Sequence, residues 1–257
     1  MSIYQHFRIE ERIFVDQVLD WKQDVIVQYT YKLTDFLDPR EQDILKTIIG
    51  KDEEISLSFW GGASSTERKR AMLFPSYFEL AKNDFQIQAF ELRYPRKFIT
   101  LEHRDILGSI MGLGMKREKF GDILITDEVI QVLVANEVAS FIELNLQKVG
   151  QAKVKIVPIN EEDIIENVEE WTEESTTISS LRLDTLLSAI YNISRTKSSL
   201  YIDRGLVKVN WKTIEDGAFQ VQEGDYLSVR SFGRSKLLSI AGSTKKGKIR
   251  IVFGRKK

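Results

Sequence analysis

The residues best suited to chemistry lie in the last third of the chain, where cationic side chains recur among glycines, serines and aspartates. The string consists of Arg182-Leu183-Asp184, Ser194-Arg195, Gly205-Leu206-Val207-Lys208-Val209-Asn210, Gly224-Asp225, Arg230 and Gly233-Arg234. Residues 181–257 hold 16 Lys/Arg and 6 Asp/Glu, a net charge of +10, whereas residues 1–180 hold 21 and 32, a net charge of −11. Such concentrated positive charge suits a polyanionic partner, because each neutralised phosphate releases condensed counterions.

Composition excludes most cysteine and histidine chemistry. The 257 residues contain no cysteine and two histidines, His6 and His103, which lie far apart in the sequence. The chain therefore has no disulfide, no thiol nucleophile and no multi-histidine metal site, and a Ser–His–Asp triad would need one of these two side chains. We expect no metal and no cofactor.

No segment has the sequence of a membrane anchor. The first residues reach Glu10 and Glu11 without a long apolar core, so they do not resemble a secretory signal. No apolar run approaches the roughly 20 residues that a membrane-spanning helix needs. Together with the absence of cysteine, this predicts a cytoplasmic protein without a membrane partner.

A second set of cations lies in a glycine-bounded segment, Gly112 to Gly121. Lys116, Arg117 and Lys119 lie within it, and glycine permits close approach of the backbone to a phosphate. The Gly-Lys-Ser/Thr ending of a Walker loop is missing. We interpret this segment as a candidate phosphate-contacting loop, and the alternative is a helix end followed by a solvated turn.

Residues 1–80 are predicted to form an amino-terminal α+β domain. An amphipathic helix is indicated by apolar residues at steps of three, four or seven, namely Tyr4, Phe7, Phe14, Val18, Trp21 and Val25. Asp38 and Glu41 predict a capping box at the start of a second helix, and residues 55–60 alternate as a strand does. We interpret the charge run at residues 67–70 as an exposed helical turn, with a nucleic-acid-binding patch as the alternative.

Residues 81–160 follow the order β-α-β-β-α-β. The expected strands cover residues 85–94, 122–126, 129–134 and 152–158, and the expected helices cover residues 103–112 and 136–149. This order is typical of a ferredoxin-like fold, in which two helices cover a four-stranded sheet. We therefore expect a ferredoxin-like middle domain.

Residues 161–178 are predicted to form an acidic linker. Eight Asp/Glu lie between Glu161 and Glu174, with no Lys or Arg among them. Stretches of this composition are usually solvated, as linkers or surface helices. The alternative is an autoinhibitory strip that competes with a polyanion for the basic tail.

Residues 179–257 are predicted to form a small domain in which two short helices pack against an antiparallel sheet. One helical face would carry Leu183, Leu186, Leu187 and Ile190. Ser194 would cap the second helix, because its hydroxyl can accept a free backbone N–H. The strands are expected near residues 207–209, 227–229, 236–242 and 247–253. The predicted fold class of the whole chain is α+β, and its length allows two or three domains.

This tail resembles the RNA-binding domain named after small-subunit ribosomal protein S-four. The resemblance rests on Arg-Leu-Asp, Ser-Arg, Gly-x-Val-x-Val-Asn and Gly-Asp at the positions given above. It implies that the residues contacting phosphate, sugar or bases are Arg182, Arg195, Lys197, Lys208 and Asn210, with Arg230 and Arg234 at the margin. Arginine can grip phosphate with two hydrogen bonds, and asparagine can both donate to and accept from a base or a 2′-hydroxyl. Asp184 would orient a neighbouring arginine, because a free carboxylate repels phosphate.

The domain order and the length are similar to those of the bacterial YlmH family. Further matched segments are residues 36–42, 67–70, 112–114, 116–119 and 121–123. The resemblance implies a non-catalytic protein that binds rRNA or tRNA and acts in ribosome-associated quality control, on a large ribosomal subunit that still holds peptidyl-tRNA. Lys116, Arg117 and Lys119 would then offer a second RNA contact. Some family members are encoded beside cell-division genes, so cell-division proteins are a further expected class of partner.

Two other functions stay open as alternatives. Domains of the S-four type also accompany pseudouridine synthases and tyrosyl-tRNA synthetases. A synthase needs a catalytic Asp in its own Arg-Leu-Asp setting, and here that tripeptide lies inside the binding domain, while the His-x-Gly-His and Lys-Met-Ser-Lys-Ser motifs of a synthetase are missing. The other alternative is an interaction scaffold linked to cell division, which would give the acidic body of the chain a role.

Overall fold

Local sequence signals place the start and the end of helix α2 (Pro39–Ile49). Asp38 Oδ1 accepts a hydrogen bond from the Glu41 backbone N–H (2.9 Å), and Glu41 Oε2 accepts one from the Asp38 N–H (2.7 Å). Pro39 lies in the first turn, where its missing N–H is not needed, and Gly50 ends the helix with a φ of 59°. The predicted capping box is confirmed.

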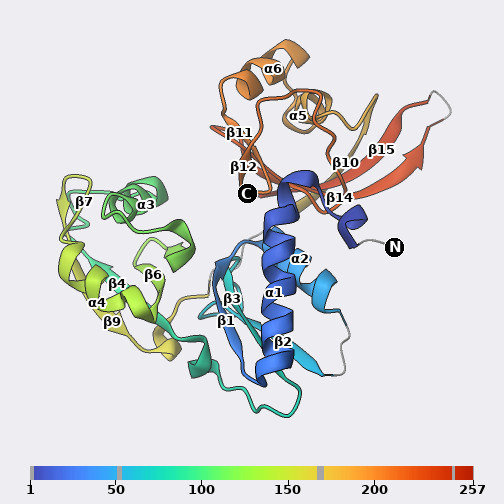
Figure 1. The fold of residues 1–257 in the computed structure, drawn as a ribbon. Coiled ribbons are helices and arrows are strands. Elements are labelled where there is room, and N and C mark those ends of the chain that lie inside the picture. Colours follow the sequence, from blue (N-terminus) through green and yellow to red (C-terminus); the bar gives the residue numbers. More distant parts are fainter. Residues whose placement is uncertain (1–2, 51–53, 167–170, 245–246, 257) are drawn as a thin grey trace. The chain divides into compact units, whose positions relative to one another are not determined.

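The computed structural model describes residues 3–50, 54–166, 171–244 and 247–256. They fold into two compact units, residues 1–167 and residues 168–257, which we call the body unit and the tail unit (Figure 1). Helices and strands are mixed in both units, so the fold class is α+β as predicted. Short 3-10 turns cover Ile3–His6, Ile9–Glu11, Lys82–Phe85, Arg117–Lys119 and Glu161–Asp163.

The body unit begins with a helical layer on a three-stranded antiparallel sheet. Its elements besides α2 are α1 (Arg12–Gln28), β1 (Lys32–Leu37), β2 (Ile55–Trp60) and β3 (Lys69–Pro75), with the strand order β1-β3-β2. Figure 1 shows α1 lying along this sheet. The predicted amphipathic helix begins only at Arg12, so Tyr4 and Phe7 precede it, yet both pack against the same apolar core.

Strands β1 and β3 have no counterpart in the sequence predictions. β3 is the central strand, and six consecutive residues, 70–75, are buried, so the alternation that reveals a half-buried strand is absent. The strand also begins with two cations, Lys69 and Arg70, which composition alone assigns to the surface. Burial on both faces therefore explains why the strand was not predicted.

The second half of the body unit has the predicted ferredoxin-like order. Its main elements are β4 (Ile87–Arg93), α3 (His103–Met111), β5 (Phe120–Ile125), β6 (Ile130–Ala135), α4 (Asn136–Asn145) and β9 (Lys155–Ile159). The sheet is antiparallel with the order β5-β6-β4-β9, and both helices pack into its apolar core.

The segment after α4 differs from the prediction, which extended the helix to residue 149. The helix stops at Asn145 because Leu146 leaves the helical conformation and is buried in the core. A hairpin follows, formed by β7 (Lys148–Val149) and β8 (Ala152–Lys153), and Gly150 turns it with a φ of 56°. The Gly150 N–H donates to Ser109 Oγ (3.2 Å), which holds the hairpin to α3.

The tail unit places two helices, α5 (Leu183–Tyr191) and α6 (Arg195–Asp203), on a six-stranded antiparallel sheet. The strands are β10 (Trp171–Ile178), β11 (Val207–Val209), β12 (Lys212–Thr213), β13 (Tyr226–Val229), β14 (Gly233–Ser243) and β15 (Ile249–Lys256). Their order is β10-β15-β14-β13-β11-β12. The predicted leucine face of α5 is buried against the sheet, as is Ile202 of α6.

The prediction that residues 161–178 form a linker is wrong for residues 171–178. These form β10, which pairs with β15 over eight positions at the edge of the sheet. Its acidic side chains protrude to solvent while the backbone is paired, and Glu174 lies 3.8 Å from Arg255. The acidic composition correctly predicted that these side chains are exposed, but it could not predict that their backbone is paired in a sheet.

Candidate nucleic-acid interface

A buried carboxylate organises two arginines at the start of helix α5. Arg182 is the last extended residue before the helix, and Asp184 lies in its first turn. Asp184 Oδ2 accepts from Arg182 Nη2 (2.8 Å) and from Arg195 Nη2 (3.0 Å), while its Oδ1 accepts from Thr185 Oγ1 (3.0 Å). The Asp184 side chain is 6% exposed, against 38% for Arg182 and 57% for Arg195. The buried aspartate therefore orients both exposed guanidinium groups, which is the role predicted for it.

The charge on Asp184 is secured by these contacts. Burial works to raise its pKa, but hydrogen bonds from Arg182, Arg195 and Thr185 outweigh that effect and lower the pKa to about 2. The carboxylate therefore stays ionised at neutral pH, and the two arginines keep their anchor.

The first turn of α6 adds further exposed cations. Ser194 Oγ accepts from the Lys197 backbone N–H (3.1 Å), so Ser194 is the predicted cap and presents Arg195 and Lys197 at the helix start. The Lys197 ammonium lies 5.4 Å from the centre of the Phe232 ring. Arg230, in the turn between β13 and β14, is also exposed. Arg182, Arg195 and Lys197 therefore belong to the helical layer, and we call them the helix-side cations.

Lys208 and Arg234 lie elsewhere, on the face of the sheet opposite the helices. Lys208 is exposed between two buried valines whose side chains pack under the helices, so its own side chain points away from them. Ser228 pairs with Lys208 on one side and with Arg234 on the other, which puts all three on one face. The structure thus divides the predicted cations between two faces of the tail unit.

The face of the sheet opposite the helices also carries residues that the sequence predictions missed. Tyr226 pairs with Lys236, and the Lys236 ammonium lies 4.3 Å from the centre of the Tyr226 ring. The rings of Trp211 and Trp171 lie 5.2 and 6.2 Å from that of Tyr226. The alternation of β13 and β14 could have revealed Tyr226 and Lys236, because the residues that alternate with them along the strands are buried and apolar or small, namely Leu227, Val229, Ser235 and Leu237.

Asn210 has a structural task that the predicted RNA contact did not foresee. Its side-chain oxygen accepts from the Tyr226 backbone N–H (2.9 Å), and its amide nitrogen donates to Asp225 Oδ1 (2.8 Å). Its φ of 47° is in the left-handed region, which asparagine tolerates better than most residues. The Asn and the Asp of the matched pattern therefore bind each other and stabilise the turn after β11.

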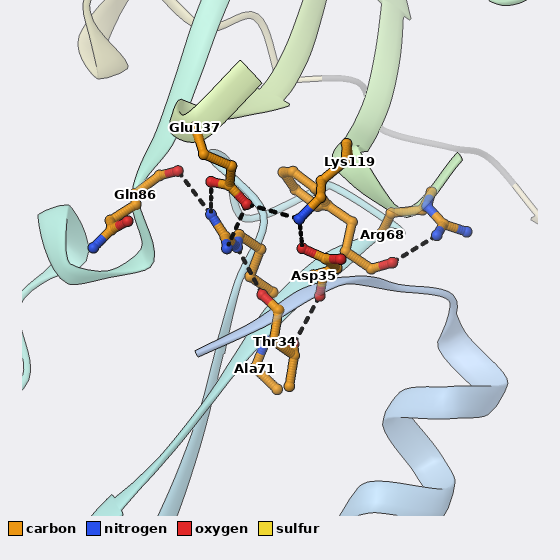
Figure 2. Close-up of polar contacts among 9 residues, drawn as sticks. Thr34, Asp35, Arg68, Ala71, Gln86, Lys119 and Glu137 are labelled. Carbon is orange, nitrogen blue, oxygen red and sulfur yellow. Dashed lines mark hydrogen bonds and ion pairs between the residues drawn. The ribbon is translucent and has the colours of Figure 1, made fainter. Parts of the chain in front are cut away.

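The glycine-bounded cations of the body unit make contacts within the protein. Arg117 Nη1 donates to the Phe120 carbonyl (2.6 Å), and the Lys119 ammonium donates to Asp35 Oδ1 (2.6 Å) and Glu137 Oε1 (3.1 Å), as Figure 2 shows for Lys119. Burial works against the charge of Lys119, but these hydrogen bonds raise its pKa. Lys116 is exposed.

Gly121, at the end of this segment, serves packing rather than approach to a ligand. A Cβ atom added there would lie 2.7 Å from Cε1 of Phe36, a distance that real side chains do not reach. Phe36 lies in β1 and Gly121 in β5, so the glycine lets the two sheets of the body unit pack closely.

The charge run at residues 67–70 is neither an exposed helical turn nor an exposed patch, so both interpretations were wrong. Arg68 and Arg70 are buried at the start of β3. Arg70 donates to the Thr34 carbonyl (2.8 Å), the Gln86 carbonyl (3.0 Å) and Glu137 Oε2 (3.2 Å). Arginine is suited to such burial because its planar group satisfies several acceptors at once.

Arg68 makes the same kind of bridge between the two sheets of the body unit. Its Nη2 donates to the Phe36 carbonyl (2.6 Å) and its Nε to the Phe120 carbonyl (3.3 Å). Asp122 accepts from the backbone N–H groups of Glu67 (2.6 Å) and Arg68 (3.1 Å), and burial raises its pKa. The run therefore fastens the amino-terminal sheet to the ferredoxin-like domain.

Two negative findings hold for the residues that the structure describes. No three of their acidic or histidine side chains are grouped so that they could hold a metal ion. None of their helices has both the length and the apolar character needed to cross a membrane.

Comparison with known proteins covers nearly the whole chain. Three family models match it: "YlmH, N-terminal" at residues 10–78, "Putative RNA-binding domain in YlmH" at residues 81–163 and "S4 domain" at residues 181–226. The chain is 47% identical over 256 residues to "Ribosome-associated protein quality control protein P2" of Bacillus subtilis (strain 168), which covers 100% of this chain and 99% of that protein. A solved structure, "Cell division protein ylmH from Streptococcus pneumoniae", is 34% identical with a TM-score of 0.54, and covers 64% of this chain and 100% of its own.

Proposed function

The chain belongs to the YlmH family, and from this membership and the cationic surface of the tail unit we propose that it is a non-catalytic RNA-binding protein of the ribosome. It binds structured rRNA or tRNA and recognises the large ribosomal subunit that carries peptidyl-tRNA. The name of the Bacillus subtilis relative supports ribosome-associated quality control as the process. We expect it to work in the cytoplasm, where ribosomes translate.

The observation that carries this proposal is the pair of arginines held by Asp184. The recorded contacts involve Nε and Nη2 of Arg182 and only Nη2 of Arg195. A guanidinium has five N–H donors, so donors are left on both arginines for phosphate. Because the aspartate already fixes both side chains, less conformational entropy is lost when RNA binds.

The same cluster supports a non-catalytic role. The single Arg-Leu-Asp of the chain places its aspartate under two arginines, with an ionised and nearly inaccessible carboxylate. A pseudouridine synthase needs such an aspartate at a reacting base, which this one does not reach. Incubation of the protein with tRNA and rRNA, followed by mass analysis of the RNA, tests this point, and any modified nucleotide would overturn it.

The decisive experiment compares binding of purified large ribosomal subunits by the wild-type chain and by the Arg195→Ala variant. We expect the variant to bind about tenfold more weakly, because a charge-assisted phosphate contact is lost. Sedimentation of the protein with the subunits measures this, and circular dichroism shows whether the variant is folded.

Arg250→Ala is the matched control. Arg250 is an exposed arginine of the tail unit on β15, far in sequence from the helix-side cations, and its removal changes the net charge equally. We expect its affinity to equal that of the wild type. Equal binding by the Arg195 variant and the wild type, or an equal loss in both variants, contradicts the proposal.

A second candidate function is supported by one finding. The Streptococcus pneumoniae structure is named a cell division protein, which favours an interaction scaffold that binds cell-division proteins. Affinity capture from nuclease-treated cells distinguishes the two functions. Recovery of division proteins without ribosomal proteins would support the scaffold, and recovery of large-subunit proteins before but not after nuclease treatment would support RNA binding.

A further inference from the structure

Cations gather at one end of the ferredoxin-like sheet, away from the segment at residues 116–119. Strands β4 and β9 pair up to Arg93 and Lys155, so the end of one strand and the start of the other coincide. The loop at residues 94–102 follows the end of β4, and the β7–β8 hairpin immediately precedes the start of β9 in the sequence. We call this region the basic end and define it by Arg93, Arg96, Lys97, Phe98, Lys148, Lys153 and Lys155.

The basic end contains two pairs of like charges that face each other across strands. Arg93 lies opposite Lys155, and Lys148 lies opposite Lys153. Directly opposite like charges destabilise a sheet. Arg93 is partly compensated by Glu91 at 2.8 Å, but for the three lysines the structure records no ion pair among the residues it describes. An anion placed between these lysines would relieve the repulsion.

Two acidic residues near the basic end, Glu91 and Glu102, are paired with arginines. Glu102 lies 3.0 Å from Arg104 at the start of α3. The exposed turn with Asp127 and Glu128 joins β5 to β6 at the same end of the sheet, beside the end of β4, so it bounds the cationic strip on one side. The strip from the loop at residues 94–102 to the hairpin therefore faces solvent as a positive surface.

An exposed aromatic ring lies in the loop at residues 94–102, next to Lys97 in the sequence. Phe98 is 86% exposed, although it is a large apolar side chain. Its backbone N–H donates to the Pro95 carbonyl (3.1 Å), so it sits on a defined turn beside Lys97. Aromatic rings among cations are the usual means by which proteins bind unpaired nucleotides, since any base can stack on the ring while the cations meet its phosphates.

We propose that the basic end is a second RNA-binding site, which stacks an unpaired base on Phe98 and holds the adjoining phosphates with Lys97, Lys153 and Lys155. This inference rests on the proposed function and extends it to the middle domain. It assigns to this domain a ligand class, single-stranded RNA, that differs from the structured RNA bound by the tail unit. It also moves the second RNA contact from residues 116–119, where Arg117 and Lys119 make internal contacts.

The first test measures the affinity of the full chain for single-stranded oligouridine RNA and, separately, for large ribosomal subunits. We expect Phe98→Ala and the double variant Lys153→Ala/Lys155→Ala each to weaken oligouridine binding about tenfold. The double variant should resist urea at least as well as the wild type, because it removes repulsion within the sheet. A loss of RNA binding without a loss of stability is a result that a purely structural role would not give.

Matched controls are available for both changes. Tyr77→Ala removes another aromatic ring of similar exposure, and Lys116→Ala removes an exposed lysine of the same domain. We expect neither to change oligouridine binding. If Lys116→Ala weakens it and the basic-end variants do not, the second site lies at residues 116–119 and this inference is overturned.

A photo-crosslinking benzoylphenylalanine in place of Phe98 gives a second readout on ribosomes. Crosslinks to RNA support the inference, and crosslinks to protein alone, or none, overturn it. Failure of the wild-type chain to bind large subunits would instead overturn the proposed function. Normal subunit binding that depends on Arg195 but not on Phe98 or the two lysines would overturn this inference alone.

Discussion

The body unit and the tail unit use arginine and carboxylate in opposite arrangements. In the body unit the cation is inside, since the Arg70 side chain is 5% exposed and its partner Glu137 is 37% exposed. In the tail unit the carboxylate is inside, and Asp184 lies beneath the two exposed arginines described above. Both clusters contain charge-assisted hydrogen bonds, yet only the second presents exposed arginines to solvent.

This difference shows that a charge run reports on function only after its burial is known. Arg70 begins a central strand at the junction of two domains, so its donors face backbone carbonyls. Arg195 begins a surface helix, so its donors face solvent and one buried acid. Arginine therefore stabilises internal packing in the body unit, whereas in the tail unit it is a candidate RNA-binding residue.

Replacement of Arg70 by Met should give the largest effect. We expect the body unit to lose about 3 kcal/mol of stability, because two carbonyls and one carboxylate lose a buried donor. Urea unfolding followed by hydrogen exchange in body-unit peptides measures this. Arg70→Lys keeps the charge but cannot donate to all three acceptors at once. Its stability should therefore lie between that of the Met variant and that of the wild type. A fully stable Met variant with weakened RNA binding would reverse the roles assigned to the two clusters.

Replacement of Asp184 by Asn should destabilise the tail unit by about 2 kcal/mol at pH 7. The lowered pKa of Asp184, about 2 against an ordinary 3.8, corresponds to roughly this energy. Because the pKa is lowered on folding, the stabilisation is fully present above about pH 4 and disappears as the pH falls towards 2. Hydrogen exchange of tail-unit peptides should therefore show a difference in stability between the variant and the wild type at pH 7, and this difference should become smaller in acid. If the difference in stability does not change with pH, Asp184 stabilises the tail unit through the shape of its side chain and not through its charge.

The salt dependence of RNA binding should show the smallest effect. Loss of Arg195 should reduce the slope of log affinity against log salt by about 1, because one phosphate contact is removed. Arg70→Lys should leave that slope unchanged, since Arg70 is buried in the body unit. Titrations of large ribosomal subunits at several salt concentrations measure both slopes. A lower slope in the Arg70 variant would mean that the body-unit network also reaches RNA.

Much of the fold was predictable because its signals are local. The Asp38–Glu41 capping box, the Ser194 cap and the β-α-β-β-α-β order all appear in the structure. The role of Asp184 was also predictable, since a free carboxylate would repel phosphate and an arginine lies two residues away. Sequence periodicity reports these features because it reflects contacts within one turn or one strand.

The errors share one physical cause, which is contact between residues distant in sequence. Strand β10 was predicted to be a linker because its partners in β15 lie 71 to 85 residues later in the sequence, and no local pattern indicates that pairing. The structural role of Asn210 was missed because its partner Asp225 belongs to another turn, while its RNA contact stays a prediction. The basic end was overlooked because Arg93 and Lys155, 62 residues apart in the sequence, are brought together only by the register of β4 and β9.

The sequence by itself determined the helices with clear caps, the ferredoxin-like order and the accumulation of positive charge in the tail, because capping, periodicity and composition act over a few neighbouring residues. Only the tertiary structure decided which cations face solvent. Arg70 meets Glu137 across 67 residues and Lys119 meets Asp35 across 84, so their burial depends on how two domains dock. Exposure of charge is a property of packing, and packing in this protein is set by contacts that no short stretch of sequence contains.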